Sequence, residues 1–416
     1  MKHLLFSLFL LAATFTTAIA QQTSVLFIGN SYVFTENLPA VLYYLALERG
    51  DSIYYESSTP GGYTLEGHTT NATTLSKIAS RDWDFVVIQE QSQKPSFPPA
   101  QVASETFPYA QILVDSIQSN YECTEPVFFM TWGRRDGDLQ NCQFYPPLCT
   151  FEGMNGRLRE SYLQMGLDNE STVAPCGAAW HQMSLVNNTF WSSLYAPDGS
   201  HPSARGSYLN ACIFYATILR KSPVGLEYYY NVGATDGPAL QQLAEDIVLD
   251  STSNWFIGHQ DVVSDADYSF SGLTAQFTAN AANATDHFWD FGDGQTSSVE
   301  NPSNTYGTDG DYTVTHIAFS DCGSDTTVLL VEISPLSIES HEINEIELMI
   351  NENNVVLINP TETSFQIEMF DLNGRLTFSG LLGMKSSTNL ENKSPVEMRV
   401  IRISNGRVMR TLKVVN

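Results

Sequence analysis

The chain has 416 residues, a length that suits two or three domains. Its 46 acidic and 20 basic side chains give a formal net charge of −26, which repels phosphate groups and argues against nucleic acid and anionic membrane surfaces as partners. Hydrophobic residues make up 43% of the sequence, enough for real cores, so the acidic excess is best interpreted as the solvated surface of an extracellular protein.

The N-terminus has the pattern of a secretory signal peptide, which we assign to residues 1–20. Lys2 and His3 precede an apolar run that ends in Ala18-Ile19-Ala20. A short basic start, a short apolar core and a small-x-small end predict cleavage on export. The alternative is a membrane anchor, but threonines interrupt the run and it is short for a bilayer span. We expect a protein that is secreted or attached to the cell surface, with no membrane span in its mature form.

The next region, 21–258, alternates strand patterns with helix patterns. Short continuous apolar runs predict strands buried on both faces. Strands are expected at 25–28, 52–56, 85–88, 127–130 and 172–174. Helices are expected at 38–48, 102–118, 156–165, 203–220 and 239–249. This alternation predicts an α/β fold, a parallel sheet covered by helices, in which ligands bind beyond the carboxyl ends of the strands.

Export permits disulfides, and the sequence contains six cysteines. Cys142 and Cys149 lie in one loop rich in glycine, proline and aspartate, which makes theirs the easiest pairing to propose; the pairing of the others stays open. The same loop, 133–150, is a candidate part of a lid. Neither a Cys-x-x-Cys pair nor a His/Cys cluster with zinc spacing occurs in the sequence, so we expect no metal and no cofactor.

The first predicted strand runs directly into Gly29-Asn30-Ser31-Tyr32. A serine between a parallel strand and a helix is a recurring place for a nucleophile, because the helix N-terminus favours a developing anion and the glycine permits a sharp turn. The same residues would also suit an ordinary helix cap. Ser31 is therefore a candidate nucleophile that still needs a base.

The segment Asp198-Gly199-Ser200-His201-Pro202 can supply that base. A serine hydroxyl is a weak nucleophile until a base takes its proton, and the base must be held in the right tautomer by an acid. His201 and Asp198 provide both groups from one turn. The alternative is a capping aspartate beside an exposed histidine. His181 is a rival base, but no acid lies next to it in the sequence, so we favour a structural role for it.

Other strand ends carry candidate oxyanion donors and substrate contacts. Gly62 follows the second strand, where a glycine either leaves its backbone N–H open to an oxyanion or only forms a tight turn. Gln89 and Gln91 follow the strand at 85–88, and their amides are candidates for a further donor or for plain surface polarity. Trp132 and Arg134 follow the strand at 127–130 and are candidate substrate contacts at the same rim, or ordinary loop residues.

Together these segments resemble the SGNH (GDSL-like) hydrolases over roughly residues 23–222. The segment 27–32 is similar to the family's first block, with Asn30 where aspartate is usual, and 61–62 is similar to its glycine block. The segment 198–202 is similar to its final Asp-x-x-His block. One departure is clear: the family's Gly-x-Asn is missing, and Gln-Glu-Gln-Ser-Gln stands at 89–93 instead.

The resemblance implies a flavodoxin-like three-layer α/β/α sandwich and ester hydrolysis, often of acetyl groups on sugars. It implies Ser31 as the nucleophile, His201 as the base and Asp198 as the group that orients it. It further implies an oxyanion hole from the backbones of Ser31 and Gly62 plus a third side chain. The missing Gly-x-Asn leaves open which residue, Gln89 or Gln91 among them, is the third donor.

After residue 258 the helical periodicity disappears, and short strand patterns alternate with turns. Phe288-Trp289-Asp290-Phe291-Gly292-Asp293-Gly294 is a dense aromatic–turn motif, and Tyr306 and Gly310-Asp311-Tyr312 continue its rhythm. The segment 259–335 thereby resembles a PKD domain, an immunoglobulin-like β-sandwich common in secreted bacterial enzymes. Such a domain serves either as a spacer or as a sugar-binding surface, and alternation makes Trp289 a core residue rather than a ligand platform.

The last segment, 336–416, is also β-rich. Ile358-Asn359-Pro360, Phe370–Arg375, Arg402–Arg407 and the ending Lys413-Val414-Val415 resemble the C-terminal sorting domain of type IX secretion in Bacteroidota. That resemblance implies the secretion machinery as a partner. The alternative is one more β adhesion module.

These observations predict a secreted serine esterase that removes ester groups, with O-acetyl groups on a carbohydrate as the expected substrate. Two alternatives stay open. One is a non-catalytic glycan-binding protein on a degenerate hydrolase scaffold, motivated by the unusual 89–93 segment. The other is an enzyme for lipid esters or acyl transfer, which the lack of a long apolar lid segment in the sequence disfavours.

Overall fold

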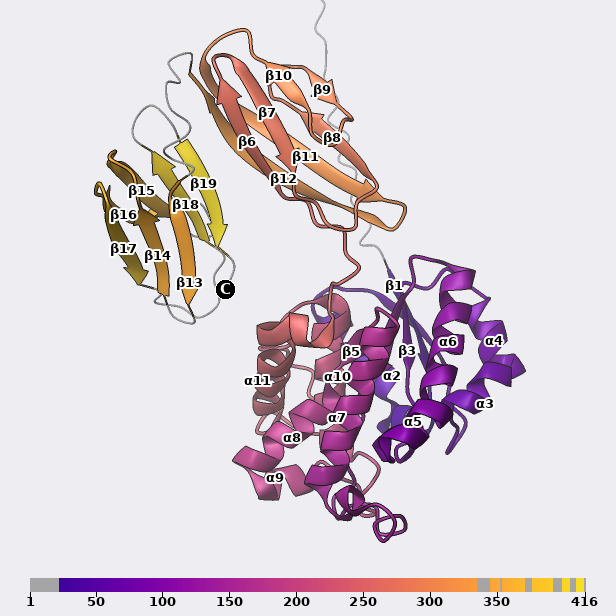
Figure 1. Ribbon diagram of the computed structural model, residues 1–416. Coiled ribbons are helices and arrows are strands. Elements are labelled where there is room, and N and C mark those ends of the chain that lie inside the picture. The colour runs from indigo at the N-terminus through magenta and orange to yellow at the C-terminus, as the bar shows by residue number, and fades with distance from the viewer. Residues whose placement is uncertain are drawn as a thin grey trace, which may run out of the picture. The chain divides into compact units, whose positions relative to one another are not determined.

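The computed structural model describes residues 22–334, 345–351, 354–370, 376–391, 399–404 and 409–414. The chain divides into two compact units, residues 1–259 and 260–416. Figure 1 shows helices around a sheet in the first unit and antiparallel strands in the second. The predicted signal peptide lies outside the described residues. Within the described ranges, no helix is both long enough and apolar enough to span a membrane.

The first unit is built on a five-stranded parallel sheet in the order β2-β1-β3-β4-β5. The central strands are buried on both faces, which is why they read as continuous apolar runs; the side chains of residues 25–28 are fully buried. This confirms the α/β fold with a parallel sheet. The strands are β1 (Thr23–Ile28), β2 (Ile53–Ser58), β3 (Phe85–Ile88), β4 (Glu125–Phe129) and β5 (Thr172–Ala174).

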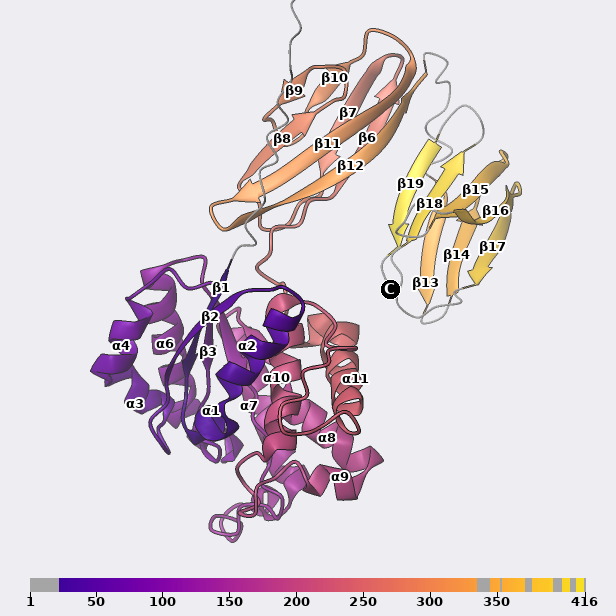
Figure 2. The same cartoon turned by 180° about the vertical axis from the view of Figure 1, so that it is seen from behind.

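Helices cover both faces of this sheet. On one face α2 packs against α10, and on the other α6 packs against α3 and α4, as the opposite views in Figures 1 and 2 show. The α-helices are α1 (Ser31–Phe34), α2 (Leu38–Glu48), α3 (Leu65–Thr70), α4 (Ala72–Ile78), α5 (Pro99–Glu105), α6 (Phe107–Asn120), α7 (Phe151–Asp168), α8 (Cys176–Val186), α9 (Asn188–Ser192), α10 (Ala204–Leu219) and α11 (Gly237–Val248). Short 3₁₀ segments lie at Thr35–Asn37, Lys94–Ser96, Pro146–Cys149 and Leu249–Trp255.

The helices α3, α4, α8 and α9 lie outside the expected helical ranges, and two of the expected helices differ clearly in extent. The single helix expected at 102–118 is two helices, α5 and α6, that meet at Thr106, because Pro108 lacks an N–H and begins a new helix instead of continuing the old one. The helix expected at 156–165 begins five residues earlier, at Phe151. There the Thr150 hydroxyl caps it by accepting a hydrogen bond from the Gly153 N–H at 3.1 Å.

The second unit begins with two antiparallel sheets, β10-β7-β6 and β12-β11-β8-β9. Trp289 is fully buried between them and packs 5.3 Å from Phe277, ring centroid to ring centroid, so it is a core residue as expected. The strands are β6 (Ala266–Ser271), β7 (Thr274–Ala279), β8 (Asp286–Asp290), β9 (Thr296–Ser297), β10 (Ser303–Thr305), β11 (Gly310–Ser320) and β12 (Gly323–Ile333).

The C-terminal part forms two further antiparallel sheets, β13-β14-β17 and β16-β15-β18-β19, around a core that includes Leu357, Ile367 and Ile401. The strands are β13 (Glu347–Asn351), β14 (Asn354–Asn359), β15 (Phe365–Phe370), β16 (Leu376–Leu382), β17 (Ser386–Glu391), β18 (Arg399–Ser404) and β19 (Met409–Val414). Of the segments that suggested a sorting domain, 371–375, 405–407 and 415 lie outside the described residues, as does the expected boundary at 335/336.

Candidate active site

Ser31 is the first residue of α1 and stands three positions after the last residue of β1. Gly29 makes the turn possible because there is no room for a side chain there. An added Cβ would lie 2.6 Å from the Gln89 side-chain oxygen and 2.8 Å from a methyl group of Val33. The glycine and the helix together fix the Ser31 hydroxyl at the carboxyl edge of the sheet.

Asn30 caps α1 and joins the nucleophile turn to its neighbour. Its side-chain oxygen accepts a hydrogen bond from the Tyr32 N–H at 3.2 Å, and its side-chain amide donates to the Tyr63 carbonyl at 2.8 Å. The second bond ties the turn to the loop that carries Gly62. An aspartate could cap the helix, but an ionised carboxylate could not donate to a carbonyl, so the amide serves both purposes here.

The structure brings Ser31, His201 and Asp198 into one hydrogen-bonded line. His201 Nε2 lies 2.8 Å from Ser31 Oγ, and His201 Nδ1 lies 2.5 Å from Asp198 Oδ2. The other carboxylate oxygen of Asp198 accepts the backbone N–H groups of Ser200 at 2.9 Å and of His201 at 3.0 Å. The residues expected to act together are thus in contact, with the imidazole between the hydroxyl and the carboxylate.

The carboxylate of Asp198 is held in its ionised form. Its partial burial alone would raise its pKa, but the hydrogen bonds from the His201 ring and from the backbone N–H groups of Ser200 and His201 outweigh that effect. The pKa of Asp198 therefore lies below its ordinary value. An ionised acid behind Nδ1 favours the tautomer in which Nε2 can accept a proton from Ser31.

A stack of aromatic rings supports the loop that carries the base. The Tyr32 ring lies 4.9 Å from Trp132, and Trp132 lies 3.9 Å from Trp180, both nearly parallel. The Tyr32 hydroxyl is 2.7 Å from the Ser200 hydroxyl, and the Trp132 indole N–H donates to the Ser200 carbonyl at 3.1 Å. The Tyr32 ring also meets the His201 ring edge to face at 5.3 Å between centroids. The rings therefore hold Ser200, the residue next to the base.

Trp132 does not lie where the sequence suggested. It was a candidate substrate contact, but its side chain is completely buried inside the stack. It therefore contacts Ser200 of the loop that carries the base, and it is not exposed to a substrate. Arg134 is half-buried with its guanidinium 3.3 Å from the Asp138 carboxylate, and its role as a substrate contact stays a prediction. That carboxylate is buried and also accepts hydrogen bonds from the side chains of Gln93 and Asn141, both at 2.7 Å.

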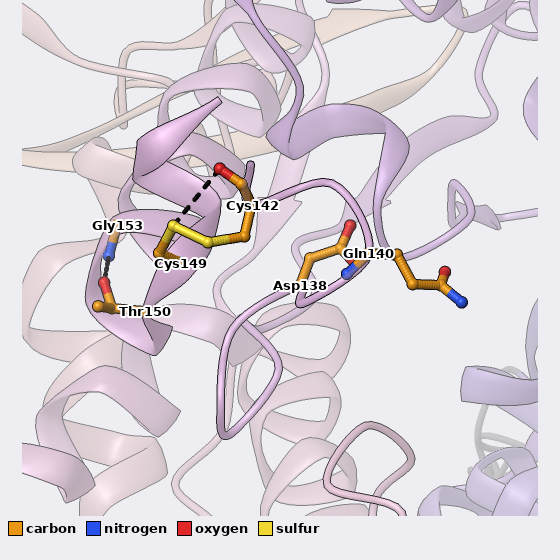
Figure 3. Close-up of a disulfide and its surroundings, with 6 residues drawn as sticks. All are labelled: Asp138, Gln140, Cys142, Cys149, Thr150 and Gly153. Atoms are coloured by element: carbon orange, nitrogen blue, oxygen red, sulfur yellow. Dashed lines mark hydrogen bonds between the residues drawn. A yellow bond between two sulfur atoms is a disulfide. The ribbon is translucent and has the colours of Figure 1, made fainter. Parts of the chain in front are cut away.

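Asp138 begins the loop that contains the predicted disulfide. The structure forms the bond between Cys142 and Cys149, whose Cα atoms are 4.6 Å apart (Figure 3). Within this loop the Asp138 N–H donates to the Leu148 carbonyl at 2.7 Å. The pairing is as expected, and the bonds of Asp138 fasten the start of the loop near the site.

The glutamine-rich end of β3 plays a different part from the one predicted. Gln89 is fully buried; its side-chain oxygen accepts the Asn30 N–H at 2.9 Å, and its amide donates to the Glu90 carbonyl. Through its oxygen Gln89 supports the nucleophile turn, and its role as an oxyanion donor stays a prediction, because only one of its two amide N–H groups is bonded, to the Glu90 carbonyl. The Gln91 amide is half-buried and donates to the Gln93 side chain at 3.1 Å, so its role as a donor stays a prediction.

Gly62 lies in an exposed turn with φ of +69°, a conformation that favours glycine, and nothing lies within 4 Å of the place a Cβ would take.

Glu90 is a buried residue near the site that the sequence analysis did not single out. This buried carboxyl accepts the Leu65 N–H at 3.1 Å and the Gln91 N–H at 2.6 Å, and its second oxygen has no partner among the described residues. Burial raises the pKa of Glu90 to about 7.

The other two histidines near the site have structural contacts. His68 is buried in α3, with Nε2 2.9 Å from the Gly29 carbonyl and Nδ1 2.8 Å from the Thr74 hydroxyl. His181 Nε2 lies 2.9 Å from Glu152, in keeping with the structural role favoured for it. Among the described residues, no group of three or more His, Cys, Asp or Glu side chains could hold a metal ion.

Several solved structures resemble this one in fold. A DUF4886 family protein from Bacteroides uniformis is 17% identical, with a TM-score of 0.47, over 55% of this chain and 95% of that chain. A proposed SGNH hydrolase from Slackia heliotrinireducens is 26% identical, with a TM-score of 0.39, over 48% of this chain and 100% of that chain. The acetyl xylan esterase AlAXEase is 12% identical, with a TM-score of 0.38, over 47% of this chain and 99% of that chain.

No curated protein matches the chain. Residues 260–334, however, match the family model of the PKD domain. The crystal structure of the PKD1 domain of Vibrio anguillarum Epp is 29% identical, with a TM-score of 0.18, over 18% of this chain and 94% of that chain. The prediction drawn from the motif around Trp289 is confirmed: the second unit begins with a PKD domain.

Proposed function

We propose that the first unit is a serine esterase with Ser31 as nucleophile, His201 as base and Asp198 as the acid that orients the base. One observation carries the proposal: the unbroken line of hydrogen bonds from the Ser31 hydroxyl through the imidazole to an ionised carboxylate. A structural serine at a helix start does not need an imidazole on its hydroxyl, whereas a nucleophile does.

The reaction follows from this geometry. Ser31 Oγ attacks the ester carbonyl carbon while its proton passes to His201 Nε2, and Asp198 stabilises the imidazolium that forms. The tetrahedral intermediate collapses to an acyl-serine, and the leaving alcohol takes the proton from His201. A water molecule then attacks the acyl carbon with His201 as base, which releases the carboxylic acid and restores the Ser31 hydroxyl.

The developing oxyanion needs donors at the same edge of the sheet. The proposed donors are the backbone N–H groups of Ser31 and Gly62, with the Gln91 amide as the candidate third. The open surroundings of Gly62 support this assignment, because the residue is exposed and nothing lies within 4 Å of the place a Cβ would take. The bond from Asn30 to the Tyr63 carbonyl supports it as well, since it ties the two turns together.

The finer parts of the proposal are the substrate and the compartment. We propose an O-acetyl ester on a carbohydrate and export across the cell envelope, guided by an N-terminal signal peptide and a type IX sorting domain at 336–416. The resemblance to SGNH hydrolases and the adjoining PKD domain support these assignments. Mass spectrometry of the protein exported by its host would test the compartment by identifying the first and last residues.

A fluorophosphonate probe tests the central claim, because it labels only an activated serine. We expect the unaltered protein to be labelled and Ser31→Ala to be unlabelled, with p-nitrophenyl acetate hydrolysis lost in parallel. Absence of labelling on correctly folded protein would instead support the second candidate function, a non-catalytic glycan-binding protein. The missing Gly-x-Asn donor at 89–93 motivates that alternative.

A further inference from the structure

A cavity of about 620 Å³ opens beside the loop that carries Asp198 and His201. Its volume lies in the range of about 300–1,000 Å³ that is usual for small-molecule sites. One wall is the Arg135–Asp136 segment that follows β4. The other wall is α9 with the residue after it. The side chains that line this second wall are Asn188, Thr189, Trp191, Ser192 and Ser193.

Both walls are bonded to the segment that carries the acid and the base. The Arg135 N–H donates to the Gly199 carbonyl at 2.9 Å, and Gly199 stands between Asp198 and His201. On the other side, the Ser203 hydroxyl donates to the Ser193 carbonyl at 2.7 Å. The Ala196 N–H donates to the His201 carbonyl at 2.8 Å. A ligand in this cavity therefore lies against the same loop that delivers the base to Ser31.

The lining is polar and carries no net charge. Two nitrogen atoms of the Arg135 guanidinium contact one carboxylate oxygen of Asp136, at 2.8 and 3.1 Å, so the two formal charges offset each other. Hydroxyl groups and one amide supply further donors and acceptors around them. Such a surface can pair with many hydroxyl groups, whereas a long acyl chain would leave these polar groups without partners at a cost in free energy.

Trp191 adds an aromatic surface to the polar lining. Its ring is held by Phe151 at 4.7 Å and by Tyr195 at 5.5 Å between centroids, the second at right angles. The side chain stays half-exposed at the cavity. A fixed indole supplies contact area at a low entropic cost, and its apolar face suits the C–H face of a sugar ring.

We infer that this cavity is a subsite for a neutral carbohydrate, and that it holds the sugar unit next to the one whose ester Ser31 cleaves. The inference rests on the proposed esterase function and specifies its substrate class. The offset charges at Arg135 and Asp136 and the chain's overall charge of −26 favour an uncharged sugar over a uronic acid.

The test compares kcat/KM for acetylated oligosaccharides from xylan and glucomannan with kcat/KM for p-nitrophenyl acetate, which is too small to fill the cavity. We expect the oligosaccharide-to-acetate ratio to fall about tenfold in Trp191→Ala and severalfold in Asn188→Ala. Trp191→Phe, which keeps a ring between Phe151 and Tyr195, should lose less than Trp191→Ala. Gln111→Ala is the matched control, because Gln111 is an exposed amide on α6 and does not line the cavity.

Each outcome bears on one claim. An unchanged ratio in folded Trp191→Ala and Asn188→Ala would overturn the subsite. So would a preference for acetylated oligogalacturonate over both neutral oligosaccharides. Failure to hydrolyse any ester would contradict the esterase instead. Calorimetric titration of the unaltered protein with the same neutral oligosaccharides would then decide the subsite alone: binding lost in Trp191→Ala supports it, and no binding overturns it.

Discussion

The Tyr32 hydroxyl lies 2.7 Å from the Ser200 hydroxyl, although 168 positions separate the two residues. Tyr32 directly follows Ser31, and Ser200 directly precedes His201. The contact therefore joins the residue after the proposed nucleophile to the residue before the proposed base.

We expect Tyr32→Phe to lower kcat about fivefold to tenfold, because it removes one hydrogen bond worth about 1 kcal/mol and leaves the aromatic stack in place. Steady-state hydrolysis of p-nitrophenyl acetate measures the change. Tyr44→Phe, at an exposed tyrosine of α2, is the control and should behave as the unaltered protein. Equal rates for Tyr32→Phe and the control would show that Tyr32 does not position the base.

Asp198→Asn should lower kcat by about 10⁴, since an amide neither stabilises the imidazolium nor fixes its tautomer. Near-native circular dichroism would show that the loss is chemical rather than structural. The resulting rate should stay above that of Ser31→Ala, which removes the nucleophile itself. A loss of less than tenfold would mean that another group orients His201.

Glu90 should make the first unit less stable as the pH rises. Burial raises its pKa to about 7 from an ordinary 4.5. The folded chain therefore keeps a proton that the unfolded chain releases between these values, and the free energy of unfolding falls across that window and levels off above it. A pKa shift of this size lowers the free energy of unfolding by about 3 kcal/mol between the two ends of the window.

Glu90→Gln removes this dependence. We expect the variant to match the unaltered protein near pH 4.5 and to be more stable than it at pH 8, as measured by calorimetry of the full chain. Glu105→Gln replaces an exposed carboxyl on α5 and should show no such divergence. If Glu90→Gln were equally or less stable at both pH values, the carboxyl would not be protonated in the folded chain.

The disulfide between Cys142 and Cys149 closes a short loop. It should stabilise the folded loop by about 2 kcal/mol relative to the unfolded chain. Within that loop the side chain of Phe144 is 78% exposed. We therefore expect Cys142→Ser/Cys149→Ser to become sensitive to chymotrypsin after Phe144, whereas the oxidised protein resists. Mass spectrometry of the fragments identifies the cleavage site, and equal resistance of both forms would show that Asp138 and its partners hold the loop without the disulfide.

The sequence predicts the parts of this molecule whose signals are local. A strand buried on both faces is visible as an apolar run, so the strands that end beside Ser31 and Trp132 can be located from the sequence. The acid and the histidine, three positions apart, can also be recognised in the sequence. Proton transfer from a serine needs both residue types close together, and this spacing supplies them from one turn. The break at Thr106 has a local signal as well, because Pro108 cannot continue a helix, but the apolar pattern that runs across it favours a single helix.

The supporting residues could not be predicted, because their partners are distant along the chain. The sequence leaves Gln89 as an oxyanion donor or as surface polarity, whereas in the fold its side-chain oxygen accepts the N–H of Asn30, 59 positions away. Trp132 reads as a rim residue until two other rings close over it. Glu90 gives a weak signal, an acid directly after an apolar strand, but its burial depends on the helix that begins at Leu65.

The spacing of Asp198 and His201 has one more consequence. Because the acid binds both the ring and the backbone N–H of the same histidine, the contact between the acid and the base is made within four residues. Any displacement of this segment would carry both groups as a single piece and part them only from Ser31. The contact between Asp198 and His201 would thus outlast such a displacement, and only the contact between His201 and Ser31 would be lost.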